Sequence, residues 1–214
     1  GPNGAGKSTI FNIITGKVLP SKGKIFFKGQ DVTGTSPHKL NRRGLARSFQ
    51  ITNIFRTMTV FQNVRNAILS KNKIRYNMFS RLDRMKDIND QTDRVLEQIG
   101  LLDRRDVVAG LLSYGQQRAL EIGLTIATEP ELILLDETTA GMSSEETREA
   151  VKLIERVTQG KTLIIVEHDM EVVFSLADRI TVIYYSEVLA SGPPDEIRQN
   201  QKVKDAYLGE EKEE

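Results

Sequence analysis

The chain has 214 residues, enough for one sizeable domain that carries an inserted subdomain. Lys and Arg number 30 against 29 Asp and Glu, so the net charge of +1 provides no overall basic field and no nucleic-acid partner is expected. The absence of Cys excludes disulfides and thiol chemistry, and with only two His it argues against a structural zinc site. No apolar run approaches about 20 residues, so no membrane-spanning helix is predicted.

The first nine residues match a phosphate-binding loop, G-x-x-x-x-G-K-[ST]. Its glycines let backbone N–H groups point at a phosphate, Lys7 supplies positive charge to the β- and γ-phosphates, and the Ser8 hydroxyl is placed to ligate Mg²⁺. A helix predicted from Thr9 to Gly16 would add its positive N-terminal end. The predicted nucleotide contacts are Asn3, Gly4, Ala5, Gly6, Lys7, Ser8 and Thr9.

Such a loop normally follows a buried strand, yet residue 1 already lies inside it. We therefore expect the domain to be incomplete at its N-terminus, with at least one central strand and the side chain that stacks on the base lying before Gly1. ATP binding and stability of the chain as given are expected to be weakened, and its own hydrolytic activity is left open.

Three short elements follow. A strand is predicted at 24–29 and a helix from Pro37 to about Arg43, with Ser36 as its N-cap. His38 on that helix has no companion ligand and is predicted to be a surface residue. A strand at 44–50 would place Gln50 at its end.

The character of the sequence changes between 53 and 111. Apolar residues recur at helical spacing around Val60–Ile68 and Val95–Ile99, and the stretch 71–93 between them is dense in charges of both signs. We predict that 53–111 is a helical subdomain inserted in the core. Its basic residues are compatible with nucleic acid or lipid, but charge patterning favours a solvated face.

Alternating strands and helices occupy the remainder. Helices are predicted at 116–128, 144–157, 170–177 and 195–200, and strands at 132–135, 162–166 and 179–184, followed by a hairpin-like segment at 187–191. The continuous apolar runs at 132–135 and 162–166 are typical of strands buried on both faces of a parallel sheet. The alternation therefore predicts an α/β fold of the P-loop NTPase type.

Acidic and imidazole side chains follow the two buried strands. Asp136 can hold Mg²⁺ together with Ser8, and Glu137, the next residue, can polarise the attacking water. His168 follows the next strand and would lie at the same edge, where ligands bind in such sheets, so we predict that it contacts the γ-phosphate.

The order and spacing of these motifs resemble the ATP-binding cassette (ABC) ATPases over essentially the whole chain. Leu112-Ser113-Tyr114-Gly115-Gln116 stands where that family has its L-S-G-G-Q signature. The resemblance implies a Mg²⁺-dependent ATP hydrolase with a mostly parallel sheet flanked by helices. It also implies a head-to-tail pair of like or unlike subunits, in which Ser113, Gly115 and Gln116 complete the partner's ATP site.

Other roles and partners follow from the same resemblance. Gln50 would sense Mg²⁺ and the transport partner, Glu137 would be the general base, His168 the γ-phosphate switch, and Thr139–Ser143 the loop that crosses the dimer interface. Transmembrane permease subunits would dock beside Gln50 and the helical insert. The protein would then lie peripherally on the cytoplasmic face of the membrane.

Within the family, three stretches are most similar to the ATPase of branched-chain amino acid importers: Arg47–Val60, Val166–Met170 and Asp205–Glu210. A lipopolysaccharide-export ATPase is similar near the C-terminus but differs around His168, and urea or amide importers stay open. The competing classes are a soluble non-transport ABC protein, which generally carries two cassettes or a coiled coil, and a non-hydrolysing regulatory subunit. Neither the solute nor the direction of transport follows from the sequence.

Three departures from the family pattern are visible. Tyr114 replaces the first glycine of the signature, Thr138 follows Glu137 where proline is usual, and Ser186 stands where a turn glycine is usual. Loss of the proline removes a fixed φ, and Ser186 is expected to be strained if its φ is positive. None of the three removes a predicted catalytic group.

Overall fold

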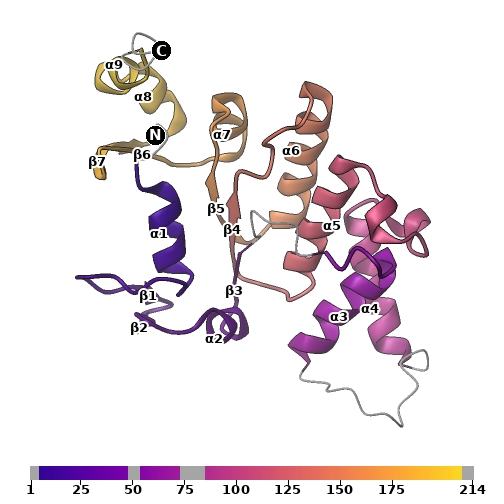
Figure 1. The fold of residues 1–214 in the computed structure, drawn as a ribbon. Coiled ribbons are helices and arrows are strands. Elements are labelled where there is room, and N and C mark those ends of the chain that lie inside the picture. The colour runs from indigo at the N-terminus through magenta and orange to yellow at the C-terminus, as the bar shows by residue number, and fades with distance from the viewer. Residues whose placement is uncertain (1–4, 48–53, 73–84, 209–214) are drawn as a thin grey trace. The chain divides into compact units, whose positions relative to one another are not determined.

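A computed structural model describes residues 5–47, 54–72 and 85–208 of the chain (Figure 1). The chain forms two compact units. One comprises Gly1–Thr35 with Ile165–Glu214, and the other comprises Ser36–Ile164. None of the helices in the described ranges combines the length and apolar character needed to cross a bilayer.

The first unit combines the N-terminal and C-terminal parts of the chain. Its elements are α1 (Lys7–Ile14), β1 (Phe26–Phe27), β2 (Gln30–Asp31), α7 (Met170–Leu176), β6 (Ile180–Tyr184), β7 (Glu187–Gly192), α8 (Pro194–Gln199) and α9 (Gln201–Leu208). The strands β1 and β2 form an antiparallel hairpin. A small core joins β6 to the last two helices through buried Ile180, Val182, Ile197 and Val203.

The strand β6 corrects one sequence expectation. It was predicted to continue the parallel alternation, but it pairs antiparallel with β7 in a two-stranded sheet, with Tyr184 opposite Glu187. The two residues between them, Tyr185 and Ser186, have φ of 47° and 64°. Positive φ at both central positions is the geometry of a type I′ hairpin turn, so the predicted strain at Ser186 is present.

The second unit holds the parallel strands. Its elements are α2 (Pro37–Arg42), β3 (Leu45–Arg47), α3 (Val60–Lys71), α4 (Lys86–Gln98), the 3₁₀ turns η2 (Leu102–Arg104) and η3 (Ala109–Leu111), α5 (Tyr114–Ile126), β4 (Leu132–Asp136) and α6 (Ser144–Thr158). The strand β5 (Thr162–Val166) begins in this unit. The sheet order is β3-β4-β5, and β3 runs parallel to β4 with Leu45 opposite Leu132.

Burial differs between the two strands that were predicted to be fully buried. All five residues of β4 are buried, as expected for a central strand. In β5, Thr162 is exposed and the other four residues are only partly buried.

The helices α3, α4 and α5 pack together on one side of this unit (Figure 1). Val60, Val64, Leu96 and Leu120 are completely buried between them. Asn63, also buried, accepts a hydrogen bond from the Phe55 N–H at 2.7 Å and donates to the Phe55 carbonyl at 3.1 Å, which pins the segment before α3. Helices thus occupy most of the described part of 53–111, while its status as an inserted subdomain stays a prediction.

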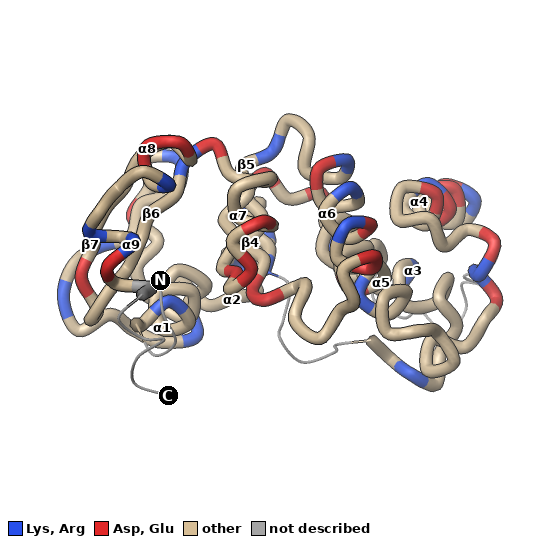
Figure 2. The backbone as a smooth tube through the Cα atoms, turned by 90° about the horizontal axis from the view of Figure 1, so that it is seen from above, with Lys and Arg blue, Asp and Glu red and all other residues tan. Residues whose placement is uncertain are grey.

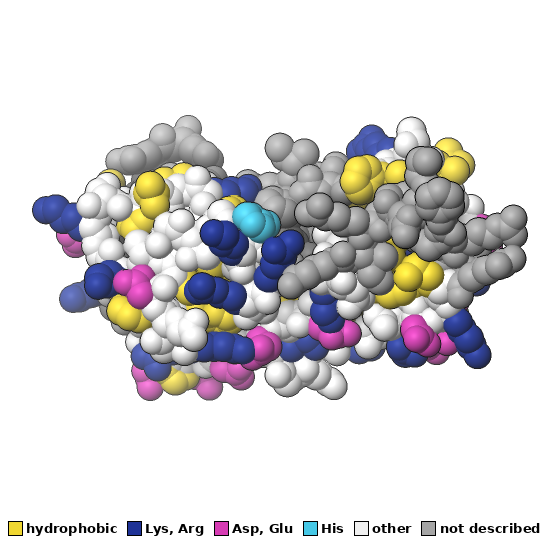
Figure 3. Space-filling model, turned by 90° about the horizontal axis from the view of Figure 1, so that it is seen from below, with side chains coloured by type: hydrophobic (Ala, Val, Ile, Leu, Met, Phe, Trp, Pro, Cys, Tyr) yellow, Lys and Arg dark blue, Asp and Glu magenta, His cyan; other side chains and the backbone are white. Residues whose placement is uncertain are grey.

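Charged residues lie on the outer faces of the helices. Acidic and basic residues alternate along α6 (Figure 2), and the exposed face of α2 carries His38, Lys39 and Arg42, with exposed Arg43 following it. A surface with many exposed Lys and Arg side chains is visible in Figure 3. His38 is exposed, as predicted, and its Nδ1 lies 3.1 Å from the Ser36 hydroxyl.

Candidate functional site

The described part of the phosphate loop leads directly into α1. Gly6 is the N-cap of that helix with φ of 91°, a left-handed conformation that only glycine adopts without strain. The helix begins at Lys7, two residues earlier than predicted, which places Lys7, Ser8 and Thr9 in its first turn. That turn contains no acidic residue, so nothing within it offsets the positive helix end. Asn3 and Gly4 lie outside the described residues.

The carboxyl end of β4 carries the predicted magnesium ligand in a buried ion pair. Arg47, at the end of β3, donates from Nη2 to Asp136 Oδ2 over 2.6 Å. The side chains are 6% and 0% exposed, so the pair is almost entirely removed from water. The pairing exists because the parallel register places Arg47 beside the end of β4.

The other oxygen of Asp136 fits a metal. Asp136 Oδ1 is buried and has no hydrogen-bond partner among the described residues. A buried carboxylate oxygen without a donor is costly unless something positive reaches it. Mg²⁺ prefers one or two carboxylates with phosphate and water oxygens, so the chemistry of this position fits the predicted ion.

Glu137 follows with a backbone φ of 49°, uncommon for a residue with a side chain. Strained backbone of this kind persists only where the surroundings hold it, and it clusters at functional sites. Thr138 and Thr139, which follow, are both buried. The turn is therefore held by buried threonines where the family usually places a proline after the glutamate.

The signature segment forms the start of α5. Ser113 is the N-cap, and a reciprocal pair of hydrogen bonds with Gln116 closes the first turn: Gln116 N–H donates to Ser113 Oγ at 3.3 Å, and Ser113 N–H donates to Gln116 Oε1 at 3.1 Å. The sequence predicted that this helix begins at Gln116, but it begins two residues earlier, at Tyr114. Gly115 lies in the first turn, and a Cβ there would lie 3.4 Å from Glu146 Oε1.

The loop Thr139–Ser143 lies beside the signature. Its Gly141 has φ of 78°, and Ser143 caps α6 through a second reciprocal pair of hydrogen bonds with Glu146. These bonds lower the pKa of the Glu146 carboxyl, the backbone N–H of Ser143 contributing most. Tyr114 Oη donates to the Ala140 carbonyl at 2.9 Å, which joins the signature to this loop within one chain.

The structure does not place the remaining predicted residues relative to this group. His168 is exposed in the first unit, directly before Asp169, which caps α7 by accepting from the N–H of Glu171 at 2.8 Å. The predicted closeness of His168 to Glu137 stays a prediction, as does that of Ser8 to Asp136, because each pair is divided between the two units. Gln50 lies outside the described residues, three positions after the end of β3.

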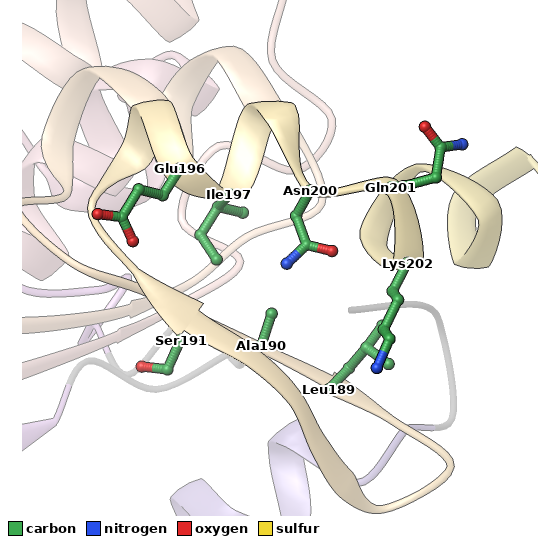
Figure 4. A pocket seen from close by; sticks show the side chains of 8 residues that line it. All are labelled: Leu189, Ala190, Ser191, Glu196, Ile197, Asn200, Gln201 and Lys202. Atoms are coloured by element: carbon green, nitrogen blue, oxygen red, sulfur yellow. The ribbon is translucent and has the colours of Figure 1, made fainter.

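One hollow in the described part of the first unit lies beside the C-terminal hairpin. It has a volume of about 550 Å³ and is lined by residues of β7, α8 and α9, among them Ile197, Asn200 and Lys202 (Figure 4). None of the predicted site residues lines it. The hollow is therefore not the predicted nucleotide site.

Sequence reasoning missed two groups of side chains near the predicted site. The first is Arg47, a charged residue that directly follows the buried residues Leu45 and Ala46 in β3. A charge next to apolar residues in a predicted strand was the signal that Arg47 has a buried partner. The second group is Arg118 and Glu121 on α5, whose side chains form an ion pair of 2.8 Å while 13% and 8% exposed. Desolvation raises the pKa of Glu121, and the Arg118 hydrogen bond opposes that rise.

Comparison with known proteins gives the family. The family model "ABC transporter" matches residues 1–140, well over half of the chain. The chain belongs to the ABC transporter family. A second model, "Branched-chain amino acid ATP-binding cassette transporter", matches residues 187–213 of this ABC protein.

Relatives and solved structures agree with this assignment. The ABC protein is 38% identical over 98% of its length to the high-affinity branched-chain amino acid transport ATP-binding protein LivG of Escherichia coli K12, of which it covers 85%. It is 37% identical to BraF of Pseudomonas aeruginosa, with the same coverage. The ADP-bound crystal structure of MJ1267, an ATP-binding cassette, aligns with a TM-score of 0.82 and 28% identity over 97% of this chain and 85% of that one.

These findings confirm the predicted fold, the predicted family and the resemblance to the importer branch. The chain is therefore an ABC-type ATPase with the P-loop fold. The roles of the individual site residues stay predictions.

Proposed function

We propose that this protein binds MgATP between two cassette subunits and hydrolyses it to drive the import of branched-chain or related amino acids. The observation that carries the proposal is the 38% identity to LivG over nearly the whole chain, together with the match of residues 187–213 to the branched-chain transporter model. The proposed location is peripheral, at the cytoplasmic face of the membrane.

The geometry of the described segments supports the roles that we propose for the nucleotide contacts. The loop ending at Gly6 and the first turn of α1 bind the phosphates through backbone N–H groups, the Lys7 ammonium and the helix N-terminus. Ser8 and Asp136 Oδ1 hold Mg²⁺, which supplies positive charge to the β- and γ-phosphate oxygens when bound.

The hydrolytic roles are proposed for three residues. Glu137 orients the attacking water and accepts its proton, His168 donates a hydrogen bond to a γ-phosphate oxygen, and Gln50 contacts the metal and reports on the permease. Ser113, Gly115 and Gln116 contact the ATP held by the partner subunit. The capped start of α5 supports this proposal, because it presents Ser113 on an exposed helix N-terminus.

An exposed apolar surface supports a permease contact beside the helical insert. The segments 55–59 and 107–111 run together, with Gly110 N–H donating to the Arg56 carbonyl at 2.9 Å and Ala109 N–H to Met58 at 2.9 Å. Around them Phe55 is 57% exposed, Val108 37% and Leu111 79%. Exposed apolar groups gathered in this way mark interaction sites, and we assign this surface to the transmembrane subunits.

The first test is sedimentation of the Glu137→Gln variant with and without MgATP. Loss of the base should trap ATP between two subunits, so an ATP-dependent shift from monomer to dimer supports the proposal. Binding of ATP in calorimetry without dimerisation would indicate that a different ATPase subunit is required. Absence of both binding and dimerisation would contradict nucleotide function for this chain.

The substrate class needs a separate test. Co-expressed with its permease and binding protein in vesicles, the ATPase should be stimulated by leucine, isoleucine or valine. Stimulation by urea or short amides alone would move the protein to the neighbouring importer branch, and activity without any permease would favour a soluble ABC protein.

A further inference from the structure

A relay of polar contacts joins the signature helix to the loop Thr139–Ser143. Tyr114, the first residue of α5, donates from its hydroxyl to the Ala140 carbonyl at 2.9 Å. Arg118, one turn later, donates to the same hydroxyl oxygen from Nη2 at 2.9 Å and from Nε at 3.2 Å. Glu121 in turn accepts from Arg118 Nη1 at 2.8 Å.

The direction of the relay follows from the donors and acceptors. The guanidinium has donors only, so its two contacts occupy the lone pairs of the tyrosine oxygen. The hydroxyl hydrogen is then left to donate to Ala140, and the charged donor polarises it. Because Glu121 is largely buried, it fixes the guanidinium in this orientation.

Two backbone hydrogen bonds of the loop are long. Ala140 N–H donates to the Glu137 carbonyl at 3.4 Å, and Met142 N–H donates to the Thr139 carbonyl at 3.2 Å. Gly141, with φ of 78°, adds conformational freedom, and a Cβ there would lie 3.7 Å from the tyrosine hydroxyl. The contact from Tyr114, at 2.9 Å, is shorter than these two and reaches the middle of the loop.

We propose that Tyr114 is a positioning residue whose hydroxyl fixes the loop Thr139–Ser143 relative to the start of α5, so that both segments meet the partner subunit already ordered. The consequence for dimerisation rests on the proposed function. The substitution of the signature's first glycine by tyrosine is then a gain of a link, since a glycine offers no side chain to reach the loop.

Ordering the loop in advance should favour dimer closure. If only a fraction of the subunits holds the loop in the conformation that the closed dimer requires, the apparent dissociation constant of the dimer equals the intrinsic constant divided by that fraction. Loss of one hydrogen bond lowers the ratio of ordered to open loop by about fivefold, and the ordered fraction falls by at most the same factor. A head-to-tail dimer closes two such sites, so the dimer dissociation constant should rise by at most about 25-fold.

The direct test is hydrogen exchange of the nucleotide-free chain and its Tyr114→Phe variant. The phenylalanine keeps the ring and removes only the hydroxyl, so amides of residues 140–143 should exchange about fivefold faster while α5 and β4 stay unchanged. The matched control is Tyr185→Phe, since Tyr185 is 82% exposed. Unchanged exchange at 140–143 would overturn the proposal.

The second test uses the Glu137→Gln background. Addition of Tyr114→Phe should weaken ATP-dependent dimerisation, by at most about 25-fold, while the ATP affinity of the monomer stays the same, a separation that general destabilisation would not produce. Arg118→Lys, which keeps the charge but loses the forked donors, should act in the same direction. Equal dimerisation would refute the link to closure. If Glu137→Gln neither binds ATP nor dimerises, the proposed function is contradicted, while hydrogen exchange still decides whether Tyr114 positions the loop.

Discussion

The buried ion pair between Arg47 and Asp136 gives the sharpest test of the structure. Replacing Arg47 by Met keeps much of the side-chain volume but leaves the Asp136 carboxylate buried without its guanidinium. Breaking a buried pair from one side typically costs 3–5 kcal/mol. Both side chains are at most 6% exposed here, so we expect a loss of about 3–5 kcal/mol in the free energy of unfolding.

The comparison that isolates the pair is a double-mutant cycle. Arg47→Met combined with Asp136→Leu removes both charges, and such replacements of buried pairs are often neutral or stabilising. The double variant should therefore be more stable than Arg47→Met alone, although it carries one more substitution. With Asp136→Leu measured alone as well, the effect of the double variant minus the sum of the two single effects gives the coupling between the two side chains.

Urea denaturation in EDTA, without nucleotide, is the suitable assay because it excludes any contribution from a bound cation. In a thermal unfolding experiment on a chain of this size, the same loss of 3–5 kcal/mol corresponds to a fall in Tm of roughly 6–20 °C. A cost of about 1 kcal/mol or less would place the pair among solvent-exposed ion pairs. That result would refute the burial argument and, with it, the view that Arg47 holds Asp136 in place.

Four further outcomes are expected. Ser143→Ala should destabilise α6 by about 1 kcal/mol in thermal unfolding. The cap lowers the pKa of Glu146, so the stability that this shift adds is present above the ordinary Glu pKa of 4.5 and is lost as the pH falls through the pKa of Glu146 in the folded protein. The variant lacks this contribution and should therefore lose less stability on acidification than the parent protein. Leu120→Ala, at a completely buried site, should cost about 2–5 kcal/mol in urea, whereas Leu111→Ala, 79% exposed, should be near neutral. Leu111→Asp should leave ATP binding intact and abolish stimulation of hydrolysis by permease vesicles; full stimulation would exclude this surface. Ser186→Gly should raise stability by about 0.5–1 kcal/mol by relieving the positive φ, and a fall would mean that the serine side chain contributes more than the strain costs.

The sequence predicted the elements whose signals are local. The run Leu132–Leu135 gave β4 to within one residue, because a strand buried on both faces needs continuous apolar residues. The helix α6 was predicted to begin at Ser144 and does so, since Ser143 and Glu146 form a capping box. The phosphate loop, the signature and Asp136-Glu137 are likewise short motifs with a chemistry of their own.

The sequence failed where structure depends on distant or atypical partners. The hairpin of β6 and β7 was only partly anticipated, because Tyr185 and Ser186 occupy a turn that Asn-Gly usually marks. The start of α5 was predicted at Gln116, two residues late, because the helix begins directly after its N-cap Ser113 and includes Gly115 in the first turn. Contacts between Arg47 and Asp136 leave no periodic trace, because 89 positions separate them.

Two polar links within the second unit constrain how its predicted site segments move. Arg47 ties the strand that leads to Gln50 to the end of β4, and Tyr114 ties the start of α5 to the loop that follows β4. Both links therefore converge on the segment from Asp136 to Ala140. If β3 moved alone, the buried Asp136 carboxylate would lose Arg47, and if the start of α5 moved alone, the Ala140 carbonyl would lose the Tyr114 hydroxyl. Breaking either contact costs more free energy than moving the linked segments together. We therefore expect the end of β3 and the start of α5 to move together with the Asp136–Ala140 segment.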